Sequence, residues 1–585
     1  MNFLRNLLAA ILGTLIAFGM IFFMFIIFVN LLNAEETVTV KKNSVLELKL
    51  KNPIADFTGS DDADPFGVFF DEKQGLDEIL HAIKVAKGDK EIKGISINNN
   101  YISAGISTTR AIRNALADFK ESGKFIYAYG DYYPQKDYYL ASIADSIFIN
   151  PVGALDFKGL AAEVLYFKDL QDKTGVKMEV IRHGKYKSAV EPFLSNEMSE
   201  ANRSQIKELM GSIWNSIITE IEEERGITKD NINIIADTLG GRKPEYAKKS
   251  GLLDDVIYYD EYENRLKHAL GIDTSDKLNS ITLQDYTKVS NKKKLQTGKD
   301  RIAIIFAQGD IIYGEGDPDF IGQGIMSEAI IKARDDKSVK AIVLRVNSPG
   351  GSALASDIIW REIELAKEKK PVVVSMGDVA ASGGYYISAG ANKIFAEPTT
   401  ITGSIGVFGV IPNINKLAGN IGINAEQVGT NKNSVDYSLF EPMSDEFRGF
   451  VKEGIEKTYQ TFLQKVAEGR NITIAEADSI AQGRVWSGAE AMELGLVDQL
   501  GGLEDAIEEA AVLADVDTYS IRKYPRYKTS FERFMEDFGG ASMLNKEQII
   551  RNELGTEVYG IYREVKSAME QQGIQARLPF TLTIK

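Results

Sequence analysis

The sequence predicts an α/β protein with two tandem copies of one domain behind an N-terminal transmembrane helix. Three observations carry this prediction: an uncharged apolar run near the N-terminus, a long internal repeat, and short apolar strands that alternate with amphipathic helices inside each repeat. A chain of 585 residues is too long for a single core. Its 44% hydrophobic and 26% charged residues are typical of a globular protein.

The apolar run extends from Leu7 to Val29 without a charge. As a helix it would be about 35 Å long, enough to cross a bilayer. Because a secretory signal has a shorter apolar region, we expect an uncleaved anchor within residues 1–34. Arg5 precedes the run and should stay in the cytoplasm, which places the body of the chain on the extracytoplasmic, periplasmic side of the inner membrane. The opposite orientation stays open, because the excess of positive charge before the span consists of a single arginine.

The internal repeat has an offset of 247 residues (377 − 130). GDVAASGGYYISAGANKIFAEP, from Gly377, resembles GDYYPQKDYYLASIADSIFINP, from Gly130. This period is far above that of solenoid repeats and indicates domain duplication, with the polar, lysine-rich stretch 290–300 as a linker. The expected parts are the anchor (1–34), a first domain (44–289), a second domain (300–524) and a helical extension (525–585).

Within the second copy, KAIVLRVNS and PVVVSM are typical of buried strands, and ALASDIIWREIELAKEKK between them is typical of a helix. Such alternation predicts α/β units with strands buried between helices. The extension contains EQIIRNELGTEVYGIYREVKSAMEQ, an amphipathic stretch that we expect to serve subunit packing.

Ser382 stands between two alanines and two glycines, where a strand pattern changes to a helix pattern. This setting fits a simple turn, or a nucleophile that a substrate backbone approaches closely. In the first copy the position of Ser382 holds Gln135, and Lys136 and Asp137 replace the two glycines. A turn needed only for folding would be needed in both copies, so the comparison favours the nucleophile.

A serine nucleophile needs a neighbouring base. All three histidines precede Ser382, which excludes the Ser–Asp–His order of hydrolases with a nucleophile elbow and leaves a His-first order open through His183. Lysine serves only if burial lowers its pKa toward about 7–8. HGKYKSAVEPF offers Lys185 and Lys187, and periodicity does not choose between them. The histidines are His81, His183 and His268.

Composition excludes several kinds of site. A net charge of −15 leaves no basic excess for phosphates, so nucleic acid is not an expected partner. The absence of cysteine rules out disulfides, thiolate metal sites and a cysteine nucleophile.

GKYKSAVEPF, RVNSPGGSALAS, DVAASGGYYISAGA and TGSIGV together resemble the signal peptide peptidase A family in its long, two-domain, membrane-anchored bacterial form. The resemblance covers essentially the whole chain. It implies the fold of the Clp protease and crotonase superfamily, in which ββα units spiral into each domain. It also implies a bowl-like homotetramer and a membrane-anchored serine endopeptidase that degrades cleaved signal peptides and similar hydrophobic peptides, without a metal or other cofactor.

By position, the resemblance implies Ser382 as nucleophile and Lys187 as general base. Gly351 and Gly383 would supply backbone N–H groups to an oxyanion hole, where glycine permits close approach of the substrate. Ser404 matches a serine that orients the lysine amine in related enzymes. A turn serine bonded to its own backbone is the alternative for Ser404.

The repeat also aligns VGTNKNSV with HGKYKSAV, which places Lys432 opposite Lys187. In relatives with one domain per chain, the resemblance implies a serine–lysine pair shared across a subunit contact. Ser382 would then pair with Lys187 of an adjoining first-copy domain, and Lys432 would face the serine-less site around Gln135. Whether the pair forms within or between chains stays open, as does a role of Lys432 in its own domain.

The expected reaction is peptide-bond hydrolysis through an acyl-enzyme. The expected partners are peptide substrates, membrane lipid around the anchor, and further copies of the chain. Two other classes remain: a crotonase-like acyl-CoA enzyme, which would not need the Ser382–Lys187 pair, and a catalytically inert membrane-tethered scaffold.

Overall fold

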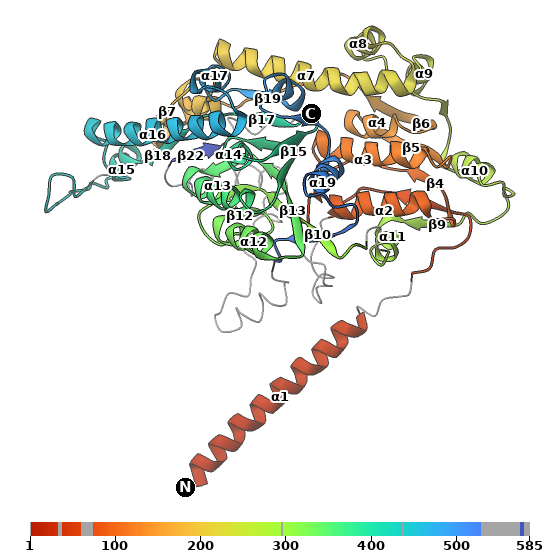
Figure 1. Ribbon diagram of the computed structural model, residues 1–585, viewed down its shortest axis with the longest axis horizontal. Coiled ribbons are helices and arrows are strands. Elements are labelled where there is room, and N and C mark those ends of the chain that lie inside the picture. The colour runs from red at the N-terminus through yellow and green to blue at the C-terminus, as the bar shows by residue number, and fades with distance from the viewer. Residues whose placement is uncertain are drawn as a thin grey trace.

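The computed structural model describes residues 2–32, 38–59, 74–293, 297–435, 437–527 and 574–577. Its body consists of two α/β halves that lie side by side, and a single helix, α1 (Asn2–Leu32), projects away from them (Figure 1). The α/β class predicted from the sequence is confirmed.

The first half is built on a six-stranded parallel sheet in the order β8-β6-β5-β4-β1-β9. Parallel neighbours need crossover connections, which α2, α3 and α4 supply between successive strands. The strands are β1 (Ser44–Leu48), β4 (Ile92–Ile97), β5 (Phe125–Pro134), β6 (Ser146–Asp156), β8 (Asp255–Val256) and β9 (Ser280–Thr282), with the separate pair β2 (Ile54–Ala55) and β3 (Gln74–Gly75). The crossover helices are α2 (Leu76–Gly88), α3 (Ile106–Lys120) and α4 (Gln135–Ala141).

The second half repeats this plan on an eight-stranded sheet whose main path is β19-β17-β15-β13-β10-β21. Its central strands are nearly continuous apolar runs buried on both faces, as parallel strands covered by helices require. Both ends of β15 lie 247 residues beyond those of β5 (372 − 125 and 381 − 134), so the offset of the sequence repeat holds in the structure. The strands are β10 (Asp300–Gln308), β13 (Val339–Ser348), β15 (Val372–Ala381), β16 (Lys393–Ala396), β17 (Ile401–Gly403), β19 (Val485–Ser487), β20 (Gln499–Leu500) and β21 (Tyr519–Tyr524).

The helices not yet named surround these sheets. In the first half they are α5 (Lys168–Thr174), α6 (Glu191–Leu194), α7 (Glu200–Arg225), α8 (Lys229–Asp237), α9 (Pro244–Lys249), α10 (Tyr259–Ala269) and α11 (Leu283–Ser290). In the second half they are α12 (Gln323–Asp335), α13 (Ala353–Lys367), α14 (Gly383–Ser388), α15 (Asn415–Asn420), α16 (Asp445–Arg470), α17 (Ile474–Ile480), α18 (Gly488–Glu493) and α19 (Leu503–Leu513).

A third sheet, in the order β12-β11-β14-β22-β18-β7, combines strands from three parts of the chain. Strand β7 belongs to the first half, yet it pairs antiparallel with β18 of the second half over six residues, from Arg182 opposite Phe408 to Lys177 opposite Asn413. The strands are β7 (Lys177–Arg182), β11 (Asp310–Ile312), β12 (Phe320–Gly322), β14 (Gly350–Ser352), β18 (Phe408–Asn413) and β22 (Gln575–Arg577).

Strand β22 comes from the predicted C-terminal extension. The amphipathic stretch expected to be helical there lies outside the described residues. Beyond residue 573 the structure describes residues 574–577, of which 575–577 form this strand.

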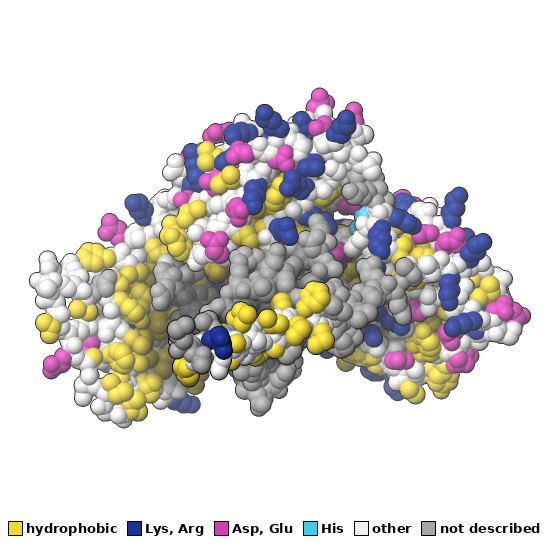
Figure 2. All heavy atoms as spheres, turned by 90° about the horizontal axis from the view of Figure 1, so that it is seen from below, with side chains coloured by type: hydrophobic (Ala, Val, Ile, Leu, Met, Phe, Trp, Pro, Cys, Tyr) yellow, Lys and Arg dark blue, Asp and Glu magenta, His cyan; other side chains and the backbone are white. Residues whose placement is uncertain are grey.

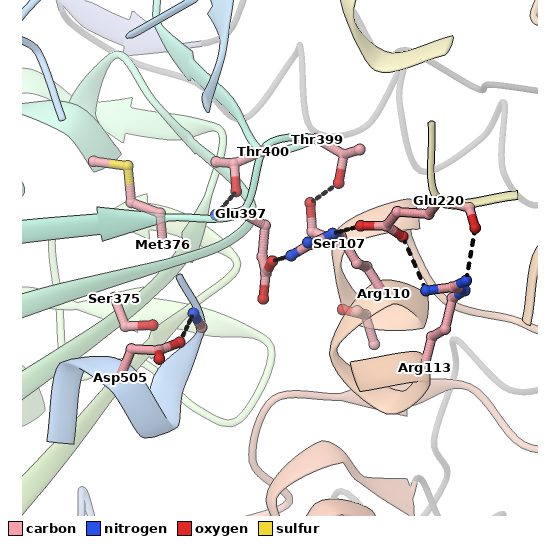
Figure 3. Close-up of polar contacts among 12 residues, drawn as sticks. Ser107, Arg110, Arg113, Glu220, Ser375, Met376, Glu397, Thr399, Thr400 and Asp505 are labelled. Atoms are coloured by element: carbon pink, nitrogen blue, oxygen red, sulfur yellow. Dashed lines mark hydrogen bonds and ion pairs between the residues drawn. The ribbon is translucent and has the colours of Figure 1, made fainter. Parts of the chain in front are cut away.

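Buried polar contacts join the two halves (Figure 3). The Arg110 guanidinium on α3 bonds Glu397 of the second half and also Glu220 on α7, at 2.6 Å from Nε to Oε1. Beside them the hydroxyls of Ser107 and Thr399 share a hydrogen bond of 2.8 Å. These contacts, with the β7–β18 pairing, hold the halves in one arrangement.

Helix α1 contains the window Arg5–Met24, with a mean hydropathy of 2.5. Within the described ranges it is the one helix long and apolar enough to cross a membrane. Figure 1 shows it projecting from the body, and Figure 2, which is seen from below, shows a row of hydrophobic side chains in front of the body. The chain therefore begins with an apolar helix of the length of a membrane anchor or a signal sequence.

Candidate active site

Ser382 occupies the junction between β15, which ends at Ala381, and α14, which begins at Gly383. Its backbone has φ 54° and ψ −112°, a conformation uncommon for a residue with a side chain. Two backbone hydrogen bonds hold it: Ser382 N–H donates to Gly403 O at 2.8 Å, and Tyr386 N–H donates to Ser382 O at 2.8 Å. Strained residues held in this way cluster at active sites.

The structure brings Lys187 to this serine within one chain. Its Nζ lies 2.8 Å from Ser382 Oγ, across 195 residues of sequence. Strand β7 pairs with β18 of the second half, and the turn after it carries Lys187 over the end of β15. Gln205 on α7 supports that turn, because its Nε2 donates to Tyr186 O at 3.1 Å.

The Lys187 amine is completely buried, with 0% of the residue exposed. Burial lowers the pKa of Lys187 well below its usual 10.5, because the charged form loses its hydration. The oxygens within hydrogen-bond distance of Nζ belong to Ser382 and Ser404 and are uncharged. The surroundings therefore favour the neutral amine.

Ser404 contributes two of these oxygens. Its carbonyl oxygen lies 2.9 Å and its Oγ 3.0 Å from Lys187 Nζ. A neutral amine has two N–H donors and one lone pair. Donation to the two Ser404 oxygens leaves the lone pair for the Ser382 hydroxyl. The Ser404 hydroxyl is thus bonded to the lysine, and the alternative of a turn serine bonded to its own backbone is wrong.

Two glycines enclose the lysine stem, and sequence analysis missed one of them. A Cβ on Gly483 would lie 2.6 Å from Lys187 Cβ, and one on Gly406 would lie 3.2 Å from Lys187 Cδ. Gly406 belongs to the TGSIGV motif, but Gly483 is far from every motif in sequence, so no local signal identifies it.

Gly351 and Gly383 lie at one place beside the serine. Gly350 and Gly351 have φ of +99° and +152°, a region that favours glycine. A Cβ on Gly350 would lie 2.7 Å from the amide nitrogen of Gly383, so the turn of β14 touches the start of α14. The turn that carries Gly350 and Gly351 therefore lies against the Gly383 amide, next to Ser382.

His183 is engaged elsewhere. His183 Nδ1 lies 2.8 Å from Glu456 Oε2, and its ring stacks on Tyr459 with centroids 3.9 Å apart. Within the described ranges, the hydrogen-bond partners of Ser382 Oγ are Lys187 and Gly406 O, the latter at 3.4 Å. The His-first order left open through His183 is therefore wrong. Lys185 lies over the ring of Tyr186, away from the serine.

The first copy holds Gln135 in the corresponding position. Its Oε1 accepts from the amide of Gly159 at 2.8 Å, and its Nε2 donates to Gly159 O at 3.1 Å. Gly159 is the repeat equivalent of Gly406 (406 − 247 = 159), so the glutamine closes onto the loop that Ser382 faces in the second copy. A carboxamide that satisfies its own loop leaves no nucleophile at this position.

Lys432 is not a substitute for Lys187. It is exposed and pairs with Glu446 at 2.9 Å, a side chain on α16 of its own half. The alternative that Lys432 serves the serine of its own domain is wrong, since Lys187 occupies that place. Within one chain, Gln135 is bonded to Gly159 and Lys432 is paired with Glu446.

Comparison with known proteins gives a consistent picture. Residues 118–273 and 364–517 each match the profile described as Peptidase family S49, one match in each copy. The chain is 39% identical to Protease 4 of Haemophilus influenzae over 75% of this chain and 73% of that protein, and 39% identical to Protease 4 of Salmonella typhi over 81% and 78%. It is 32% identical to the chloroplastic serine protease SPPA of Arabidopsis thaliana, over 95% of this chain and 80% of that protein.

Proposed function

Because the chain belongs to peptidase family S49 and is a serine peptidase, we propose that it hydrolyses peptide bonds with Ser382 as nucleophile and Lys187 as general base. The comparisons lend no support to the acyl-CoA enzyme or the inert scaffold. The observation that carries the proposal is the 2.8 Å contact between Ser382 Oγ and a fully buried lysine amine whose pKa is lowered by burial.

The reaction uses the neutral amine twice. Lys187 first takes the proton of Ser382 as Oγ attacks the scissile carbonyl, and the amides of Gly351 and Gly383 stabilise the oxyanion that forms. The lysine then protonates the leaving amine. In deacylation, Lys187 takes a proton from the water that attacks the acyl-serine and returns this proton to Ser382 Oγ as the carboxylate product leaves, which restores the free enzyme.

Ser404 is proposed as a positioning residue. Its two oxygens take both N–H groups of the neutral lysine, which fixes the direction of the lone pair. A lone pair held toward Ser382 needs no reorientation when the proton is transferred.

A serine-directed fluorophosphonate probe tests the dyad. We expect it to label Ser382 in the wild-type chain and to fail with Ser382→Ala and Lys187→Met, which should also lose peptide cleavage. Lys185→Met is the matched control two residues away, since this lysine lies over Tyr186 instead of at the serine, and it should keep activity. Full cleavage by Lys187→Met would refute the dyad.

We further propose that α1 anchors the chain in the inner membrane with the body on the periplasmic side. Its apolar window has the length and composition of a span, and an anchored peptidase would meet hydrophobic peptides, including cleaved signal peptides, where they leave the bilayer. Fractionation and external protease digestion of intact spheroplasts test the orientation. Protection of the body in intact spheroplasts would contradict the periplasmic side.

The repeat supports a homo-oligomer, which the family resemblance predicts to be a tetramer. Within the chain β7 pairs with β18, but the repeat equivalents of these strands, residues 422–427 and 161–166, have no strand pairing among the described residues. Apolar side chains near both are exposed, including Leu165 at 57% and Ile423 at 49%. Figure 2 shows hydrophobic side chains at the end that carries α15.

If residues 422–427 of one chain paired with residues 161–166 of a second chain, the contact between β7 and β18 would be repeated between chains. Lys432 would then lie toward the partner's Gln135. Light scattering of the detergent-solubilised chain measures the assembly. We expect Ile423→Asp to dissociate it and Ile474→Asp, at an equally exposed isoleucine on α17, to leave it intact.

A further inference from the structure

A short turn after α17, residues 482–484, lies between the segment that carries the proposed base and the loop that holds its amine. On one side, Tyr186 N–H donates to Gln482 O at 2.9 Å. On the other side, Ser404 N–H donates to Arg484 O at 2.6 Å. The 482–484 turn therefore determines how the segment with the lysine and the loop with Ser404 lie relative to each other.

The backbone of this turn is left-handed at two successive residues, with φ of 55° at Gln482 and 77° at Gly483. Glycine adopts this region readily, but a residue with a side chain does so at a cost in free energy. Gln482 therefore keeps its conformation only because neighbouring groups hold it there.

Two side chains from α16 and α17 hold Gln482, and these two helices pack together near β7 (Figure 1). Gln482 N–H donates to the hydroxyl oxygen of Tyr459 at 3.3 Å, and Gln482 Nε2 donates to Asp478 Oδ1 at 2.6 Å. The Tyr459 hydroxyl in turn donates to Asp478 Oδ1. We call Tyr459, Asp478 and Gln482 the tyrosine network. Its hydrogen bonds join both helices to the 482–484 turn.

Tyr459 also contacts the segment that carries the base. Its ring stacks on His183, four residues before Lys187, with centroids 3.9 Å apart. Tyr459 is 1% exposed. Burial and the hydrogen bond to Asp478 raise the pKa of Tyr459, so its hydroxyl stays protonated and acts as the donor to that carboxylate. One side chain thus holds the lysine segment through its ring and the 482–484 turn through its hydroxyl.

The first copy has a different aromatic residue at this place. Helices α7 and α16 are repeat equivalents with an offset of 245 (445 − 200), as are α8 and α17 (474 − 229), so Trp214 corresponds to Tyr459 and Asn233 to Asp478. Trp214 Nε1 donates to Asn233 Oδ1 at 2.8 Å, which keeps the bond between the helices. An indole has no acceptor for the N–H of a following turn. The acceptor belongs to the copy whose turn contacts the proposed base.

We propose that the tyrosine network positions the base of this peptidase: it holds the 482–484 turn, and the turn keeps the Lys187 amine at Ser382 Oγ. The inference rests on the proposed dyad and adds to it residues that touch neither the substrate nor the reacting atoms. Without the network the turn relaxes away from the lysine. The amine then meets Ser382 less often and regains part of its hydration.

Tyr459→Phe tests the proposal, because it keeps the ring on His183 and removes the hydroxyl. We expect kcat to fall about tenfold at unchanged KM, since the base is misplaced and the peptide site is not touched. We also expect the acid limb of the pH profile of kcat/KM to move to higher pH, because a better hydrated lysine binds a proton more tightly.

Tyr138→Phe is the matched control. Tyr138 is also buried, and its hydroxyl donates to Leu252 O at 3.0 Å within the first half. This variant removes a buried hydrogen bond and should leave both kcat and the acid limb unchanged. Equal losses of kcat in Tyr138→Phe and Tyr459→Phe would overturn the proposal, since a general loss of stability would then explain both.

Variants of the other two members separate positioning from packing. Asp478→Asn keeps an oxygen for the tyrosine, as Asn233 does for Trp214 in the first copy, and should retain most of the activity. Asp478→Leu should lose kcat as Tyr459→Phe does. Gln482 is only partly buried, so Gln482→Met carries the test if Tyr459→Phe does not fold, and it should slow fluorophosphonate labelling of the serine.

The results distinguish this inference from the dyad on which it rests. Wild-type kcat and an unmoved acid limb in both Tyr459→Phe and Gln482→Met, beside an inactive Lys187→Met, would overturn the positioning role and leave the dyad standing. Peptide cleavage by Lys187→Met at the wild-type rate would instead overturn the proposed function.

Discussion

The side-chain nitrogen of Lys187 lies 2.8 Å from the hydroxyl oxygen of Ser382, although the two residues belong to different copies of the repeat. Strand β7 crosses from the first half to pair with β18, and buried contacts such as Arg110 with Glu397 hold the halves together. The first copy thus carries Lys187, the proposed base, and the second carries Ser382, the proposed nucleophile.

The activity should depend on pH through Lys187. Burial lowers the pKa of this amine well below 10.5, and only the neutral form can take the proton of Ser382. We expect kcat/KM to fall as pH drops through this lowered pKa, with a slope of one. A pH–rate profile of the wild-type chain measures it. An acid limb that sits near 10.5 would contradict a buried neutral base.

The same pKa predicts an effect on stability. Between the lowered pKa and 10.5 the unfolded chain binds a proton at Lys187 that the folded chain does not, so the stability of the wild type rises with pH in this window, by about 1.4 kcal/mol per pH unit. Lys187→Met removes this cost. We expect it to raise Tm, with a gain that is largest at the acid end and shrinks toward pH 10.5. A gain independent of pH would show that the amine is charged in the fold.

Ser404→Ala should lower kcat with little change in KM. The variant removes the oxygen 3.0 Å from Lys187 Nζ and keeps the carbonyl at 2.9 Å, so the amine remains buried but loses one of the two bonds that aim its lone pair. A loss of about 100-fold is expected from misorientation of this kind. Ser404→Thr keeps the hydroxyl and should recover part of the activity. Equal kcat in Ser404→Ala and wild type would remove the positioning role.

Gly483→Ala tests the packing around the base. The added Cβ would lie 2.6 Å from Lys187 Cβ, and Gly483 has φ +77°. Gly495, with φ +72° and nothing within 4 Å of an added Cβ, is a matched control for the strain alone. Both alanine variants should lose about 1–2 kcal/mol of stability. Only Gly483→Ala should also lose about 100-fold in kcat/KM, and equal activity of the two variants would refute the contact.

The joint between the halves offers a comparison of a buried and an exposed ion pair. Arg110→Met leaves the buried Glu397 without this cation and should cost about 3–5 kcal/mol in the free energy of unfolding. Lys84→Met breaks another pair between the halves, with Glu504 at 2.9 Å, whose side chains are 42% and 56% exposed, and should cost at most about 1 kcal/mol. Denaturant titrations measure both. Similar losses would mean that the buried pair does not hold the halves.

Sequence patterns alone singled out Ser382 as the candidate nucleophile. A repeat that keeps the tyrosines and replaces Ser382 with Gln135 separates function from scaffold, and the structure has Gln135 bonded to Gly159. Sequence patterns alone did not identify the lysine proposed as the base. Lys185 and Lys187 stand two residues apart with the same chemistry, and only the resemblance chose between them. Burial distinguishes the two side chains, because the Lys187 amine is enclosed and the Lys185 amine lies over the ring of Tyr186.

By itself the sequence determined the α/β class, the duplication, the apolar N-terminal helix and the position of the serine, since each of these is written in local periodicity or in a fixed offset. Tertiary structure alone decided that the lysine and the serine meet inside one chain, that Gly483 encloses the lysine, and that residues 574–577 enter the third sheet. Contacts of this kind join segments that are far apart in the chain. Their geometry depends on which strands pair and on which side chains that pairing buries away from water.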